Sequence, residues 1–139
     1  MPKFELRAPG DWGEKSRRDY SYSMVMEVDS RVELSGQGGL DPLTLEFPTG
    51  RPIEAEINQA FDNVGFMLNA IGLDWKNVAH VNSYHTPEPD GSILAATAEM
   101  GRQFHRRMPD HQPIWTRLGV AVLGDKMRVE IRVTAFRDD

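Results

Sequence analysis

The stretch from Pro113 to Phe136 constrains this chain most, because apolar and other side chains alternate along it in two successive runs. Such alternation is typical of a β-strand with one buried face. Residues 123–126, Leu-Gly-Asp-Lys, separate the two runs, and a glycine at the first position of a two-residue loop suits a type II′ turn. The sequence therefore predicts a β-hairpin over residues 113–136.

The predicted register gives one face of this hairpin a distinctive chemistry. It sets Arg117 opposite Arg132 and Gly119 opposite Glu130, and it places Arg117 on the diagonal from Glu130. Trp115 extends the same face. A guanidinium fork, a carboxylate and the gap left by Gly119 could hold a small carboxylate substrate and a water molecule. A plain cross-strand ion pair on a solvated face is the alternative that the geometry leaves open.

Size and composition favour a single folded domain over residues 1–139. Hydrophobic residues make up 40% of the chain, which is enough for a core of its own. The chain has no cysteine, and this excludes disulfides and cysteine-ligated zinc. Prolines and glycines interrupt residues 1–19, so we expect an irregular N-terminal arm there.

The charge balance and the apolar runs bear on the expected partners. The formal net charge is −5, and the basic clusters are not interleaved with aromatic residues as in nucleic-acid-binding proteins. No apolar run approaches the length of a membrane span, and the N-terminus lacks the apolar segment of a signal peptide. We therefore expect a cytoplasmic protein with no nucleic-acid partner and no membrane partner.

The remaining elements follow from the spacing of apolar residues. Alternation predicts strands over residues 20–28, 31–35 and 78–86, and helical spacing predicts helices over 53–71 and about 93–108. The resulting order, ββαβαββ, indicates an α+β fold whose mixed sheet carries both helices on one face. Nothing in a single chain covers the other face, so we expect a homo-oligomer that buries sheet faces together.

The four histidines give no metal-binding pattern. His80 and His85 are five residues apart on a predicted strand, so they point to opposite faces. His105 and His111 flank the end of the second predicted helix, and no HxH or HExxH spacing occurs. We expect neither a metal ion nor another cofactor.

Three features together resemble the RidA/YjgF family of reactive enamine and imine deaminases, which is also labelled endoribonuclease L-PSP-like. They are the Ser35-Gly-Gln motif, the helix around Asn63, and the run from Arg117 through Met127-Arg-Val-Glu130. The resemblance covers residues 20–137. It implies a chorismate-mutase-like fold and a homotrimer with three clefts at its subunit interfaces. It also implies hydrolysis of 2-imino acids and their enamine tautomers to 2-oxo acids and ammonia.

The resemblance also implies roles for single residues. Arg117 matches the arginine that grips the substrate carboxylate, and Glu130 matches the glutamate that positions the attacking water. Tyr22 matches the tyrosine of the cleft, and Ser35 the serine of the Ser-Gly-Gln motif.

Two positions depart from the family pattern and widen the range of functions. Gly119 stands where a cysteine is usual, and Ala98 or Glu99 where the second helix usually carries an asparagine. A roomier pocket, lined in part by Trp115, would suit a bulkier imine or another small carboxylate. The alternatives are therefore a pathway-specific deaminase of the aminomuconate type and a non-catalytic trimer that binds a small carboxylate. Ribonuclease activity is least favoured, because the chain is acidic.

Overall fold

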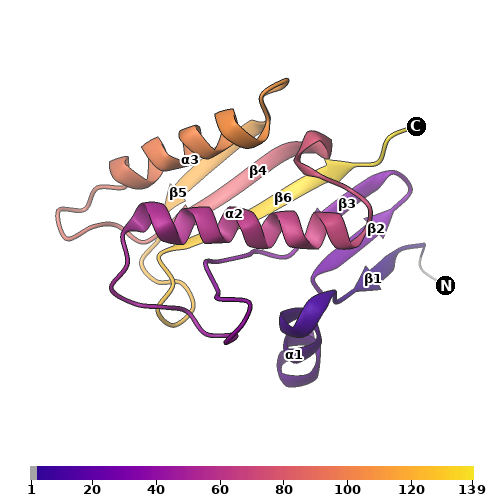
Figure 1. Ribbon diagram of the computed structural model, residues 1–139, viewed down its shortest axis with the longest axis horizontal. Coiled ribbons are helices and arrows are strands. Elements are labelled where there is room, and N and C mark those ends of the chain that lie inside the picture. The colour runs from indigo at the N-terminus through magenta and orange to yellow at the C-terminus, as the bar shows by residue number, and fades with distance from the viewer. Residues whose placement is uncertain (1–2) are drawn as a thin grey trace.

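The computed structural model describes residues 3–139, which form a six-stranded sheet in the order β1-β2-β3-β6-β4-β5 (Figure 1). The strands are β1 (Glu5–Arg7), β2 (Val25–Val28), β3 (Arg31–Leu34), β4 (Val78–His85), β5 (Ile114–Gly119) and β6 (Val129–Phe136). Strand β5 runs parallel to β4, and every other neighbouring pair is antiparallel. The sheet is therefore mixed, as predicted.

Two long helices lie side by side across one face of this sheet (Figure 1). These are α2 (Ile53–Ala70) and α3 (Leu94–Arg107). A shorter helix, α1 (Gly10–Tyr20), lies between β1 and β2 in the chain, and a 3-10 turn, η1 (Trp75–Asn77), follows α2. Helix α2 buries Ile57, Phe61, Val64 and Leu68 completely, because their spacing puts them on one side of the helix. From β2 onward the predicted ββαβαββ order, with both helices on one face, is confirmed.

The opposite face of the sheet leaves apolar side chains in solvent. Ile114, Leu118 and Phe136 are 67%, 50% and 43% exposed. Their neighbours along β6 at positions 129, 131, 133 and 135 point the other way and are fully buried under the helices. We call this side of the sheet the open face.

The predicted hairpin is wrong, because β5 and β6 do not pair with each other. Both pair with β4, β5 in parallel on one side and β6 in antiparallel on the other. The connecting residues cross the end of β4, where Val120 donates to the His85 carbonyl and Thr86 donates to the Arg128 carbonyl. The type II′ turn is also wrong, since Lys126 holds the positive φ (64°) in this loop. Alternation identified two strands correctly and could not identify their neighbours.

The prediction of an irregular arm over residues 1–19 is wrong for residues 3–19, and residues 1–2 lie outside the described part of the chain. Strand β1 pairs with β2 at the edge of the sheet, and α1 follows it. The large apolar or aromatic residues of α1 are Trp12 and the terminal Tyr20 alone, so the helix shows no helical repeat of apolar residues. The next predicted strand, residues 20–28, begins only at Val25 because α1 extends to Tyr20.

Candidate active site

The strand register separates the two residues that the sequence placed together. Arg117 pairs with Ser83 of β4, and Ser83 pairs with Ile131 of β6, so these three side chains point to the helix face. Tyr84 is the next residue of β4 and pairs with Glu130, so both of these point to the open face. Within one chain, Arg117 and Glu130 therefore lie on opposite faces of the sheet with β4 between them.

Arg117 lies on the edge strand β5 with most of its hydrogen-bonding capacity unused. Its Nε donates to Thr97 Oγ1 on α3 at 2.9 Å, and its guanidinium carbon lies 5.5 Å from the centre of the Trp115 ring. Within residues 3–139, its two terminal nitrogens have no hydrogen-bond partner and no carboxylate within ion-pair distance. A planar fork oriented in this way can bind a carboxylate through two parallel hydrogen bonds.

A buried polar chain lies beneath Arg117. Trp115 Nε1 donates to Ser83 Oγ at 2.9 Å, and Ser83 Oγ is 2.8 Å from His85 Nε2. Ser83 and His85 are fully buried, and the Trp115 and Phe104 rings pack in a T-shaped arrangement. The contacts with Ser83 and Phe104 therefore hold the Trp115 ring in place, and the Arg117 guanidinium lies against that ring. The sequence analysis missed Ser83 and Thr97, although the two-residue spacing of Ser83 and His85 put both side chains on one face.

The titration of His85 should make stability fall at acidic pH. Burial, helped by the positive charge of Arg117, lowers the pKa of His85 from 6.5 to about 4. Below pH 6.5 His85 binds a proton in the unfolded chain, whereas in the folded chain it stays neutral until the pH falls to about 4. The contribution of His85 is therefore complete above pH 6.5 and is lost towards pH 4, up to roughly 3 kcal/mol.

Urea unfolding at about pH 7.5 and pH 5 would measure this contribution, because it lies in the window where His85 titrates. His85→Gln should lose less stability between the two pH values than wild type. His80→Gln, on the open face of the same strand, should keep the wild-type pH dependence. An unchanged pH dependence in His85→Gln would contradict the assigned titration.

Glu130 lies on the open face against the backbone of the Ser-Gly-Gln motif. A Cβ on Gly36 would lie 2.5 Å from Glu130 Oε1, so only glycine leaves room for the carboxyl group there. Burial raises the pKa of Glu130 above the usual range of a glutamate. Its carboxyl group makes no hydrogen bond to any residue of 3–139. A carboxyl group with a raised pKa is a stronger base than an ordinary glutamate and can accept a proton from a bound water.

Tyr22 and Ser35 line a hollow of about 360 Å³ that also includes Arg132 and Glu33. Ser35 Oγ donates to the Ser23 carbonyl at 2.6 Å, and Arg132 is paired with the Glu33 carboxylate. Arg132 follows Glu130 by two residues on β6, so the two side chains share the open face. Tyr22, Ser35 and Glu130 thus gather on the open face, whereas Arg117, Trp115 and Gly119 belong to the helix side of the edge strand.

No group of three or more histidine, aspartate and glutamate side chains in residues 3–139 has the arrangement of a metal site. None of the helices in that part of the chain has the length and apolar character needed to cross a membrane.

Comparison with known proteins places the chain in a family. The model described as endoribonuclease L-PSP matches residues 15–137. The chain belongs to this family, the RidA/YjgF family. The family predicted from the Ser-Gly-Gln motif and the Arg117-to-Glu130 run is therefore confirmed, and so is the fold class.

Individual relatives in this family carry a common name. A 2-iminobutanoate/2-iminopropanoate deaminase of Dermatophagoides farinae is 34% identical over 110 residues, which cover 79% of this chain and 80% of that protein. A mouse protein of the same name is 42% identical over 57 residues, so the match spans less than half of either chain (41% and 42%). The crystal structure of RidA from an Antarctic Psychrobacter has a TM-score of 0.75 and 25% identity, and the match covers 99% of this chain and 100% of that one.

Proposed function

We propose that the chain hydrolyses reactive 2-imino acids and their enamine tautomers to 2-oxo acids and ammonia. The observation that carries this proposal is the unused fork of Arg117, held in place by Thr97 and Trp115. The unpaired, half-buried carboxyl group of Glu130 adds the acid–base group that hydrolysis needs. The names of the mite and mouse relatives support the same chemistry.

The reaction needs one proton acceptor and one carboxylate anchor. Arg117 binds the carboxylate of the imino acid through its two terminal nitrogens and so fixes the imine carbon. Glu130 takes a proton from a water molecule while the water oxygen bonds to that carbon. This proton passes to the imine nitrogen and gives a neutral carbinolamine. Glu130 then takes the proton of its hydroxyl group and delivers it to the amino nitrogen, so that the C=O bond forms as the C–N bond breaks, and ammonia and the 2-oxo acid leave. Glu130 ends the cycle as the carboxylate with which it began.

Two copies of the chain are needed to build this site, because one chain holds Arg117 and Glu130 on opposite faces of its sheet. Strand β5 is the outermost strand, so Arg117 lies where a neighbouring copy can reach it. The exposed Ile114, Leu118 and Phe136 give the open face an apolar surface that association would bury. A homotrimer with three equivalent clefts, as the family resemblance implies, meets both requirements.

The two departures from the family pattern affect the size of the site. Gly119 has only Ile93 Cγ2 (3.8 Å) and the His85 carbonyl (3.9 Å) near the place of a Cβ, which leaves room beside Arg117 for a larger substituent. Glu99 cannot substitute for the usual asparagine, because its buried carboxylate binds Arg102 and Gln103. These two features favour imines bulkier than 2-iminopropanoate. They also favour a second candidate function, the binding of a small carboxylate without turnover.

The test is the release of ammonia from an imino acid generated in situ. An amino-acid oxidase supplies 2-iminopropanoate or a longer 2-imino acid at a constant rate, and the decay of the imine is followed with and without the chain. Acceleration above the spontaneous rate is the expected result. The absence of acceleration, together with saturable binding of the 2-oxo acid, would favour binding without turnover and would overturn the proposed hydrolysis.

A further inference from the structure

A cavity of about 600 Å³ lies between helix α1, the middle of α2 and the loop that follows β3. This volume is in the range of small-molecule sites in proteins. Gly10, Asp11 and Trp12 form the α1 wall, and they precede residue 15, where the match to the family model begins. The cavity is therefore built in part from a segment that the family model does not include.

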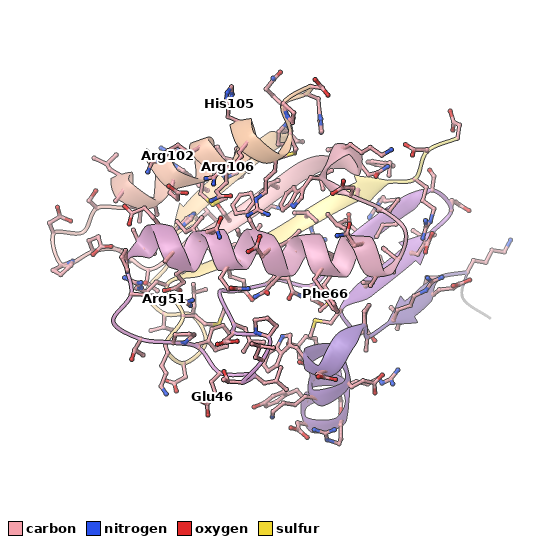
Figure 2. All side chains as sticks on the ribbon, viewed as in Figure 1. Glu46, Arg51, Phe66, Arg102, His105 and Arg106 are labelled. Carbon is pink, nitrogen blue, oxygen red and sulfur yellow. The ribbon has the colours of Figure 1, made fainter. Side chains whose placement is uncertain are left out.

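The cavity is separate from the candidate active site. Neither Arg117 nor Glu130 lines it, and neither do Tyr22 and Ser35. Phe66, which forms one wall, lies on the side of α2 that faces α1 (Figure 2). The proposed deaminase reaction makes no use of this side of the molecule.

Specific contacts fix the walls. Gly10 has a φ of +75°, and a Cβ on it would lie 2.6 Å from Phe66 Cε1, so α1 begins directly against the Phe66 ring. Asn63 Nδ2 donates to the carbonyls of Gly38 and Leu40, both at 2.9 Å, and so holds the loop against α2. The edge of the Trp12 ring contacts Phe47, with ring centres 6.3 Å apart. A ligand would therefore enter a site that is already formed, which reduces the entropic cost of binding.

The lining combines aromatic and apolar walls with hydrogen-bond acceptors. Trp12 and Phe66 supply the aromatic rings, and no lysine, arginine or histidine lines the cavity. Asp11 has no ion-pair partner within residues 3–139, and the Gln59 side-chain oxygen has no hydrogen-bond donor there. The Asn63 amide group already uses its hydrogens on the loop carbonyls. A negatively charged ligand would find no cation in this cavity, whereas an ammonium group would find a carboxylate and aromatic faces.

We infer that this cavity is a second binding site, for a small aromatic or apolar amine that is cationic at neutral pH. The ammonium group binds at Asp11 and Gln59, and the apolar body packs between Trp12 and Phe66. The inference does not depend on the proposed deaminase activity, because Arg117, Glu130, Tyr22 and Ser35 do not line the cavity, and Gln37 is the one residue of the Ser-Gly-Gln motif that does.

The test is a titration of the full chain with 2-phenylethylamine, followed by ¹H–¹⁵N NMR with the indole signal of Trp12 assigned. The amine is added to about 10 mM, where a site with a Kd of about 1 mM is close to saturation. We expect saturable shifts at Trp12, Phe66 and Gln59. Phenylacetate, which has the same ring and the opposite charge, should shift these signals at least about tenfold more weakly.

Two variants of α1 form a matched pair, because each removes one negative charge. Asp11→Asn should weaken amine binding about two- to fivefold, as expected for an exposed ion pair, and Glu14→Gln, which does not line the cavity, should leave it unchanged. Trp12→Ala should weaken it at least about tenfold, and circular dichroism would check that α1 still forms. The inference would be overturned by the absence of saturable shifts or by shifts confined to the Arg117 region. It would also be overturned if Asp11→Asn and Trp12→Ala both bound the amine with the wild-type affinity.

Discussion

Replacing Glu130 by glutamine should lower kcat for imine hydrolysis by a factor of about 100 to 10,000, the usual contribution of a general acid–base group. Glutamine has nearly the same shape and cannot accept a proton from water. The free energy of unfolding should stay at or above the wild-type value near neutral pH. This follows because burial disfavours the ionised form of Glu130 and raises its pKa, and the neutral amide avoids that penalty.

The pH profile separates this role from a structural one. In wild type, kcat/KM should rise with pH through the raised pKa of Glu130, because only the carboxylate accepts a proton. The residual activity of Glu130→Gln should lack this rise. Glu88→Gln, in the exposed loop before α3, should keep both the rate and the profile. A Glu130→Gln variant with full activity would contradict the assigned role.

Removing the guanidinium of Arg117 should lower kcat/KM on the order of 100-fold, because a bidentate charge-assisted contact contributes about 3 kcal/mol. Arg117→Lys should fall between Arg117→Ala and wild type, since it keeps the charge and loses the planar fork and the contact with Thr97.

The matched control is Arg17→Ala, because this exposed arginine of α1 pairs with the exposed Glu14 on the same helix and is not among the residues assigned to the site. Steady-state kinetics with a 2-imino acid would measure all three variants. Equal kcat/KM for Arg117→Ala and Arg17→Ala would exclude Arg117 as the substrate anchor.

The sequence predicted the two long helices, α2 and α3, because their signal is local. The apolar residues of α2 repeat with the helical period, and Gly72, with a φ of +79°, ends the helix region where it was expected. Helix α1 was missed because a short helix with a single tryptophan in its first turn has no such repeat. Its position depends on a long-range contact, the packing of Gly10 against Phe66, which no local pattern reports.

The predicted geometry of the site is wrong, whereas the roles of its residues stay a prediction. The alternation of apolar and polar residues shows which face of a strand is buried. It does not show which strand lies next to it. The analysis assumed that β5 and β6, adjacent in sequence, were also paired, as consecutive strands often are. The insertion of β4 between them moves Glu130 to the open face and leaves Arg117 on the helix side. The family resemblance implies roles for the same two residues, and those roles stay a prediction.

The most direct test of a site shared between two copies is to mix two inactive variants. Arg117→Ala and Glu130→Gln would be co-expressed in equal amounts, and mass spectrometry would verify that mixed oligomers form. If each site takes Arg117 from one copy and Glu130 from its neighbour, about one site in four of a closed symmetric ring is intact. We therefore predict recovery of about a quarter of the wild-type activity. Verified mixed oligomers with no more activity than either variant alone would show that the two residues do not act together across an interface.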